Sequence, residues 1–202
     1  MKKILVTLLA TLCLFGCESK KIDGPKVDYL EGKHKVEIVV EKYGSIKLEL
    51  DADIAPITVT NFISLIEEKF YDGLTMHRII DGFMVQGGDP EGTGYGGSEK
   101  NIKGEFIANG VENNISHVRG VISMARGEDY NSASSQFFIM HKTSPHLDGS
   151  YAAFGKVIEG MDVVNKIADE RTDYADRPLA DQRIKTMTVD TFGEVYPEPE
   201  KF

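Results

Sequence analysis

The chain has 202 residues, a net charge of −9 and only two cysteines. This length is enough for a single domain with a sizeable core. The acidic balance argues against nucleic acid as a partner, because phosphate binding needs a basic stripe. It also argues against a protein that lies flat on anionic lipid.

The first residues have the pattern of a secretory leader. Two lysines follow Met1, and an uncharged apolar run over residues 4–15 leads to Gly16 and Cys17. A basic start, a short apolar run and a small residue before the cut define a signal peptide, and this run is too short to span a bilayer. Residues 14–17 (LFGC) resemble the lipobox of bacterial lipoproteins, in which the chain is cut before the cysteine and the cysteine carries the lipid.

The leader therefore predicts a lipoprotein that is acylated at Cys17 and anchored to the cell membrane, facing outside the cytoplasm. The alternative is an ordinary signal peptide followed by an incidental cysteine. In the lipoprotein reading Cys13 leaves with the signal, so the mature chain has no thiol pair for a disulfide and no Cys-based metal site.

Four segments follow from composition. We expect a signal peptide at residues 1–16, a lipidated start and polar tether at 17–35, one body at 36–195 and a frayed tail at 196–202. The tether has almost no apolar periodicity and behaves as a flexible coil, and the tail is rich in Pro and Glu.

The body predicts many short strands and few helices. Apolar and polar residues alternate over 36–40 and 46–50, around a Tyr-Gly-Ser turn, which predicts a hairpin. Helical spacing predicts a helix over 58–68, after Pro56, and a second one over 161–168. Further strands are expected at residues 74–80, 83–86, 120–125, 136–140, 152–158 and 184–195. Short strands between glycines indicate a barrel or a sandwich, and periodicity alone does not choose between them.

The run at residues 76–89 (MHRIIDGFMVQGGD) carries the most informative chemistry. Arg78 is a permanent cation with five donors in a rigid fork, close in sequence to the apolar pair Phe83 and Met84 and to Gln86. A cation beside an apolar pocket, without an acid, base or nucleophile, suits a reaction that breaks no covalent bond. Rotation about a peptide bond is such a reaction. Taken singly, the apolar residues are core candidates and Arg78 is a surface ion-pair candidate.

Several stretches resemble, in their order, the cyclophilin family of peptidyl-prolyl isomerases. They are residues 76–89, 120–126 (GVISMAR), 135–139 (SQFFI) and 147–157 (LDGSYAAFGKV), and the match extends over most of 36–195. The resemblance implies a mainly β fold, an eight-stranded antiparallel closed β-barrel capped by two α-helices. It also implies a peptidyl-prolyl cis-trans isomerase that rotates X-Pro bonds in secreted or envelope proteins during folding, at a groove outside the barrel.

The resemblance assigns the site residues as well. A guanidinium that donates toward the proline nitrogen stabilises the twisted transition state electrostatically, and the matching position is Arg78. The catalytic residues implied are Arg78, Phe83, Gln86 and Phe138. The substrate-binding residues implied are Met84, Gly92, Ala125, Arg126, Gln136, His146, Leu147 and Tyr151.

Two positions depart from the pattern of the family. His146 stands where the most cyclosporin-sensitive members have Trp, so we expect weak cyclosporin binding. Arg126 replaces a common Asn, which affects side-chain preferences and leaves the activity in place. The expected partners are proline-containing polypeptides, with a monomeric protein, no cofactor, no metal and no nucleic acid.

Two other patterns point elsewhere. Residues 92–97 (GTGYGG) fit a G-x-G-x-x-G expression, but no βαβ unit surrounds them, so dinucleotide binding is not expected. The five histidines lack metal-ligand spacing. A binding module or chaperone that holds proline-containing segments without turnover stays open as a second hypothesis.

Overall fold

The protein, seen in a computed structural model, is described over residues 29–190. The strands are β1 (Lys33–Val40), β2 (Gly44–Asp51), β3 (Arg78–Ile80), β4 (Met84–Gly87), β5 (Val121–Met124), β6 (Phe137–Met140), β7 (Ala153–Glu159) and β8 (Ile184–Val189). The helices are α1 (Pro56–Glu67), α2 (Met161–Ala168) and the short 3-10 turns η1 (Ile107–Asn109) and η2 (Pro145–Leu147). No helix in this part of the chain is long and apolar enough to cross a membrane.

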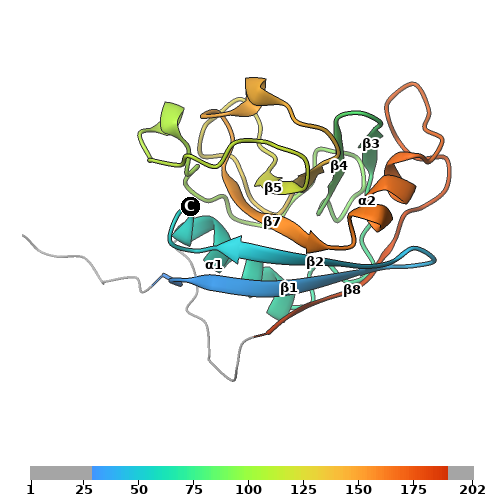
Figure 1. Cartoon of the computed structure of the whole chain (residues 1–202), viewed down its shortest axis with the longest axis horizontal. Helices are drawn as coiled ribbons and strands as arrows, with labels where there is room; N and C mark the ends of the chain where they lie inside the picture. The colour runs from blue at the N-terminus through green and yellow to red at the C-terminus, as the bar shows by residue number, and fades with distance from the viewer. Residues whose placement is uncertain (1–28, 191–202) are drawn as a thin grey trace, which may run out of the picture.

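All eight strands belong to one antiparallel sheet with the order β3-β4-β6-β5-β7-β2-β1-β8. The sheet curls into a half-barrel, and α1 and α2 lie on opposite sides of the view in Figure 1. The mainly β fold with eight antiparallel strands and two α-helices is therefore confirmed. The closed barrel is not shown, because the end strands β3 and β8 do not pair with each other, and the isolated bridge between Thr75 and Arg183 lies just before them.

Most element boundaries agree with the sequence to within a few residues. The predicted hairpin is β1–β2, and the two predicted helices are α1 and α2. The predicted boundary between tether and body falls inside β1, which begins at Lys33. Leu30, also in the range predicted as tether, is buried, and its backbone N–H donates to Thr60 Oγ1 at 3.1 Å. The predicted signal peptide, Cys17 and the predicted tail lie outside the described residues.

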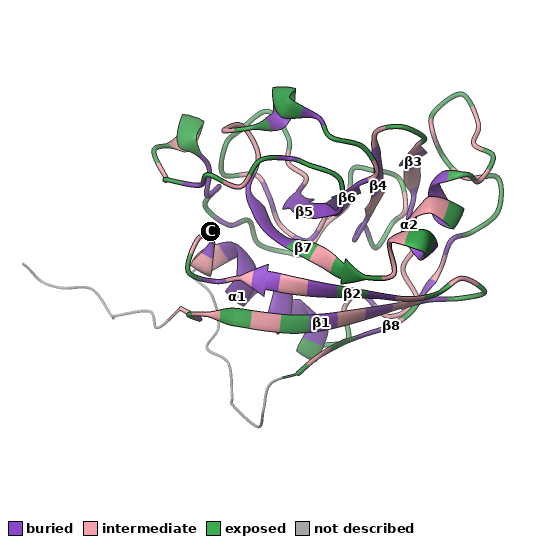
Figure 2. Ribbon diagram, viewed as in Figure 1, coloured by how far each residue is buried: buried purple, intermediate pink, exposed green. Residues whose placement is uncertain are grey.

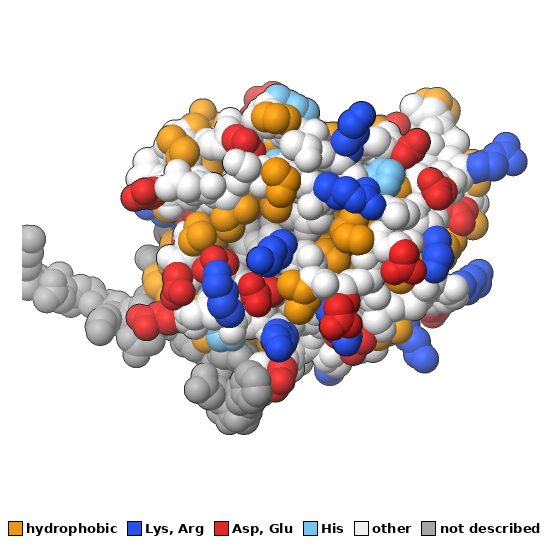
Figure 3. All heavy atoms as spheres, in the orientation of Figure 1, with side chains coloured by type: hydrophobic (Ala, Val, Ile, Leu, Met, Phe, Trp, Pro, Cys, Tyr) orange, Lys and Arg blue, Asp and Glu red, His pale blue; other side chains and the backbone are white. Residues whose placement is uncertain are grey.

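The main core lies between α1 and one face of the sheet. Phe62 of α1 packs against Tyr71, Phe137 and Phe154, with ring centroids 5.1, 5.5 and 5.1 Å away. All four are fully buried. Buried and more exposed residues alternate along β1 and β2, as Figure 2 shows, and acidic and basic side chains are interspersed over the face in Figure 3.

The strands of one half of the sheet bury residues on both faces. Along β6, Phe137 and Ile139 enter the main core, whereas Phe138 and Met140 join a second cluster on the other side. Successive strand residues point to opposite faces, so this alternation is a direct consequence of the pleat. The second cluster also holds Met84 of β4, which places two of the predicted site residues on the face away from the main core.

Helix α1 begins at Pro56, and its cap comes from a residue far along the chain. Glu105, which is buried, accepts hydrogen bonds from the backbone N–H groups of Ile57 (3.0 Å) and Thr58 (2.8 Å) and from Thr58 Oγ1 (2.7 Å). A carboxylate there satisfies two unpaired helix donors and faces the positive end of the helix dipole. Burial raises the pKa of Glu105, and the hydrogen bonds from Thr58 and Ile57 oppose that rise.

Replacing Glu105 tests this cap. Glu105→Ala leaves the buried N–H of Thr58 and the partly buried N–H of Ile57 without acceptors. We expect it to lower the free energy of unfolding by about 2–4 kcal/mol. Urea unfolding followed by circular dichroism measures this, with Glu99→Ala, a change at an exposed glutamate, as the control. A Glu105→Ala chain as stable as that control would contradict the assigned cap.

Candidate active site

A pocket of about 200 Å³ opens on the face away from the main core. It is lined by Arg78, Phe83, Met84, Gln86, Ala125, Arg126, Phe138, Leu147 and Tyr151. All but three of the residues predicted for catalysis and substrate binding therefore meet here, and the exceptions are Gly92, Gln136 and His146. The pocket combines two guanidinium groups, one amide and an apolar floor.

Strand pairing explains why distant stretches of sequence meet at this pocket. Arg78 on β3 lies opposite Gln86 on β4, and Gln86 lies opposite Phe138 on β6. Residues directly opposite one another on antiparallel strands share a face and contact one another. The cation, the amide and the ring therefore form one row across three strands.

A hydrogen-bonded chain of side chains links this row to a glycine-rich segment. Gln136 Nε2 donates to the carbonyl oxygens of Gly94 (3.0 Å) and Gly96 (2.7 Å), and Gln136 Oε1 accepts from Gln86 Nε2 at 2.8 Å. Gln86 Oε1 in turn accepts from Arg78 Nη1 at 3.4 Å. Backbone carbonyls can only accept and a guanidinium can only donate, so both amides have one possible orientation.

Asp89 holds the glycine-rich segment in place. Its carboxylate is buried and accepts backbone N–H groups of Glu91 (2.8 Å), Thr93 (2.9 Å), Gly94 (2.6 Å) and Gly96 (3.3 Å). Burial alone would raise the pKa of Asp89, but these four hydrogen bonds outweigh it and hold the pKa below its ordinary value. Residues 94–97 of the segment that fits a dinucleotide-binding expression thus form the wall of a second pocket beside the first.

A second pocket of about 470 Å³ adjoins the first. The two share Gln86, Ala125 and Arg126, and the second also contains Gln136 and the exposed Tyr95. Together they form one groove, in which Gln136 lies in the second pocket, away from the apolar floor. Two adjoining pockets of this kind suit an extended peptide better than a compact ligand.

The side chain of Arg126 is fully engaged by the protein itself. Its guanidinium carbon lies 5.1, 5.0 and 4.8 Å from the ring centroids of Phe106, Tyr130 and Tyr151. Its Nε and Nη2 donate to the carbonyl of Ser150 at 3.1 and 3.0 Å. Cation–π contacts of this kind contribute of the order of 1 kcal/mol each, so Arg126 holds Tyr151 at the edge of the pocket.

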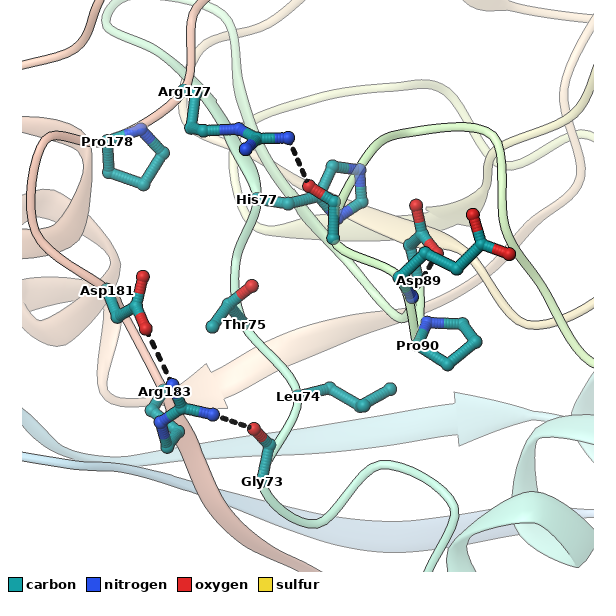
Figure 4. A pocket seen from close by; sticks show the side chains of 12 residues that line it. Gly73, Leu74, Thr75, His77, Asp89, Pro90, Arg177, Pro178, Asp181 and Arg183 are labelled. Carbon is teal, nitrogen blue, oxygen red and sulfur yellow. Dashed lines mark hydrogen bonds and ion pairs between the residues drawn. The ribbon is translucent and has the colours of Figure 1, made fainter.

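Two predicted binding residues lie elsewhere. Gly92 does not line the groove but a separate cavity of about 270 Å³, shown in Figure 4, where its carbonyl accepts from Arg177 Nη2 at 2.6 Å. The backbone at Gly92 has a φ of 64°, and the tight wrap around Asp89 directs the later carbonyls of Gly94 and Gly96 toward the groove instead. His146 is exposed and stacks on Phe83, with ring centroids 5.7 Å apart.

No local sequence pattern indicates the group of side chains that lies beneath Phe138. His117 is buried and stacks on the Phe138 ring at 6.1 Å. Its Nε2 lies 3.0 Å from Ser123 Oγ, and its Nδ1 lies 3.0 Å from Asp148 Oδ1. This resembles a hydrolase triad, but Ser123 is 0% exposed and cannot reach a substrate. The three residues therefore support the pocket floor.

The chemistry available in the groove is electrostatic. Across residues 29–190, no three His, Cys, Asp or Glu side chains gather as a metal ion requires. A fixed guanidinium beside an apolar floor, with amides behind it, defines a class of site that binds a peptide and stabilises a change in its electron distribution.

Comparison with known proteins identifies that class further. The family model for cyclophilin type peptidyl-prolyl cis-trans isomerase/CLD matches residues 35–189. Peptidyl-prolyl cis-trans isomerase CYP18-1 of Arabidopsis thaliana is 42% identical over 147 residues, which cover 72% of this chain and 90% of that protein. The human peptidyl-prolyl cis-trans isomerase-like 3 is 42% identical over 151 residues, with 72% and 90% covered.

A longer relative and a solved structure are similar to this chain as well, and both are peptidyl-prolyl isomerases by name. The chain spans only 29% of the length of peptidyl-prolyl cis-trans isomerase-like 2 of Rhizopus delemar, to which it is 43% identical over 160 residues, 77% of this chain. A cyclophilin type isomerase of Cryptosporidium parvum, crystallised in the presence of the dipeptide Ala-Pro, superposes with a TM-score of 0.71 at 32% identity, covering 78% of this chain and 99% of that one. The chain therefore belongs to the cyclophilin-type peptidyl-prolyl cis-trans isomerases, and the predicted enzyme class is confirmed.

The group beneath Phe138 predicts a pH dependence of stability. Burial lowers the pKa of His117 below 6.5, although Asp148 acts in the opposite direction. The unfolded chain then binds a proton more readily than the folded one. The stabilisation is thus complete above pH 6.5 and is lost as the pH falls through the pKa of folded His117.

We therefore expect the free energy of unfolding to fall below pH 6.5 and the slope to flatten in His117→Gln. Urea unfolding between about pH 7.5 and pH 5 measures this. Part of the slope of unfolding free energy against pH should remain in His117→Gln, because burial also lowers the pKa of His77. A variant with the same slope as the unmodified chain would show that His117 is not the titrating group.

Proposed function

We propose that this chain accelerates rotation about X-Pro bonds in secreted or envelope proteins and so assists their folding. The unpaired part of the Arg78 guanidinium carries the proposal. Of its five donors, one faces Asp176 and one faces Gln86. Three thus have no partner among residues 29–190, beside a floor made by Met84, Phe138 and Leu147.

The reaction needs such a donor and little else. An X-Pro bond has a rotational barrier of about 18–20 kcal/mol and isomerises unaided in tens to hundreds of seconds. In the twisted transition state the amide resonance is lost and the proline nitrogen regains its lone pair. A guanidinium that donates toward this nitrogen favours the twisted form. A hundred-thousandfold acceleration requires roughly 7 kcal/mol of such stabilisation.

The apolar floor supplies the other half of the site. By the family resemblance, Phe83, Met84, Phe138 and Leu147 enclose the pyrrolidine ring, and Gln86 holds the substrate backbone. The Ala-Pro dipeptide present with the Cryptosporidium parvum relative supports a proline-containing substrate. The adjoining pocket, which contains Gln136, gives room for the residues that flank the proline.

Two finer features belong to the same proposal. We infer a closed barrel, supported by backbone hydrogen bonds from Met76 to Gln182 (2.9 Å) and from Ile184 to Leu74 (2.8 Å) across the gap between the end strands. We also infer weak cyclosporin binding, because the imidazole of His146 offers less apolar surface than the indole that sensitive relatives have there. A monomer stays our expectation.

We propose further that the protein is a lipoprotein, held through Cys17 on the side of the cell membrane that faces away from the cytoplasm. The support for this is the leader itself, with its basic start, apolar run and LFGC order. The relatives named above are eukaryotic, and the family match begins at residue 35. The anchor therefore depends on the first residues of the sequence alone.

The central experiment removes the guanidinium. Arg78→Ala should lower kcat/KM about a hundredfold to a thousandfold, because it deletes the main transition-state donor, while circular dichroism stays unchanged. A chromogenic X-Pro peptide assay on the full chain measures this, with Arg171→Ala, at an exposed arginine outside the groove, as the control. An Arg78→Ala enzyme of normal speed would refute the assigned role. Peptide binding without turnover by the unmodified chain would favour the binding-module hypothesis.

The anchor has its own test in a bacterial host. Cys17→Ala should leave the precursor uncleaved and unacylated, because by the lipobox resemblance this cysteine marks the position of the cut and carries the lipid. Mass spectrometry and membrane fractionation measure cleavage, acylation and retention. Cys13→Ala, within the apolar run, is the matched control and should be processed normally. Normal lipid-dependent membrane retention of Cys17→Ala would contradict the anchor.

A further inference from the structure

The loop between α2 and β8 brings a carboxylate to Arg78 that neither the sequence nor the resemblance assigned. Asp176 Oδ2 lies 3.4 Å from Arg78 Nε, and the two side chains are 41% and 43% exposed. We propose that Asp176 is a positioning residue, which sets the orientation of the Arg78 guanidinium for the isomerisation. This inference rests on the proposed function.

The loop is built to hold this carboxylate in one place. The carbonyl of Asp176 accepts the N–H of Ile79, the residue after Arg78, at 2.8 Å. Asp176 has a φ of 62°, a left-handed conformation that Asn, Asp and Gly adopt more easily than other residues. Asp173 stabilises the turn, since its Oδ1 accepts the N–H of Arg177 at 3.0 Å and its carbonyl accepts that of Asp176 at 3.1 Å.

The same loop also contacts the glycine-rich segment, which is the other end of the hydrogen-bonded chain that starts at Arg78. Arg177 donates to the Gly92 carbonyl, the contact drawn in Figure 4. Gly92 precedes Gly94 and Gly96, whose carbonyls receive Gln136. The path from the loop through Arg78 and the two glutamines to the glycine-rich segment therefore returns to the loop. The adjacent residues Asp176 and Arg177 thus hold both ends of the hydrogen-bonded chain, at Arg78 and near the glycine-rich segment.

Two contacts on different nitrogens fix a planar group. Asp176 engages Nε of Arg78, and Gln86 engages Nη1, so the guanidinium loses its freedom to rotate about its last side-chain bonds. The remaining Nη donors then have a set direction at the pocket. An exposed ion pair of this kind contributes only about 0–1 kcal/mol to stability. Its removal should therefore affect the rate more than the fold.

Two substitutions separate these effects. Asp176→Asn keeps the left-handed backbone and the side-chain shape but removes the charge, and Asp176→Gly keeps the backbone and removes the side chain. We expect both to lower kcat/KM for an X-Pro peptide by about threefold to tenfold. The donor itself stays in place, so the loss should be smaller than that of Arg78→Ala. Asp181→Asn is the matched control, because it removes the same charge from the same loop, where the partner is Arg183.

Two further readouts distinguish orientation from general damage. High salt should slow the unmodified enzyme toward the Asp176→Asn rate and leave that variant nearly unchanged, because salt screens an exposed pair. The Nε–H resonance of Arg78 in a ¹⁵N spectrum, measured without substrate, should shift in Asp176→Asn and stay in place in Asp181→Asn.

The outcomes are decisive in both directions. Unchanged kcat/KM in both Asp176 variants overturns the proposal. If the unmodified chain itself has no isomerase activity, the proposed function fails. In that case the resonance alone decides whether Asp176 orients Arg78, and an unmoved signal overturns that as well.

Discussion

The direction of one chain of hydrogen bonds determines how the candidate site is arranged. The carbonyls of Gly94 and Gly96 receive Gln136, which therefore turns its oxygen toward Gln86, and Gln86 turns its own oxygen toward Arg78. Because no member of the chain can be reversed without placing two like groups face to face, the guanidinium is set before a substrate arrives. A fixed donor of this kind need not reorganise during the reaction.

The sheet makes such a chain possible, because its pleat gives two faces to each strand. Phe137 belongs to the main core and Phe138 to the pocket floor, so the residues that stabilise the fold and those that form the site lie on the same rigid strand. The mobile part of a typical binding site, its loops, is here restrained by two carboxyl groups, one buried (Asp89) and one exposed (Asp148). Asp89 holds the glycine-rich wall, and Asp148 ties the turn that carries Leu147 to His117.

The sequence predicted the features that short local patterns encode, namely the strand run with its site residues and the two helices. Residues 76–89 span β3 and β4, so Arg78, Met84 and Gln86 share a face by strand alternation, and the two helices follow from apolar spacing. The cap from Glu105, the stack of His117 on Phe138 and the pair of Asp176 with Arg78 join segments far apart in the chain. No local pattern encodes them. The place of Gly92 could not be predicted from the sequence, because the path of its loop depends on which N–H groups Asp89 accepts.

The groups with shifted pKa values lie outside the pocket, which fits a reaction without proton transfer. Burial lowers the pKa of His117 and raises that of Glu105, whereas backbone hydrogen bonds hold that of Asp89 below its ordinary value against the effect of burial. Each of these groups fixes a helix end, a turn or a loop, and none lines the pocket of Arg78. A reaction that transfers protons needs titrating groups at the reacting atoms. Rotation of an imide bond needs only donors of fixed direction, so the protein can place its perturbed ionisable groups in the supporting structure behind the site.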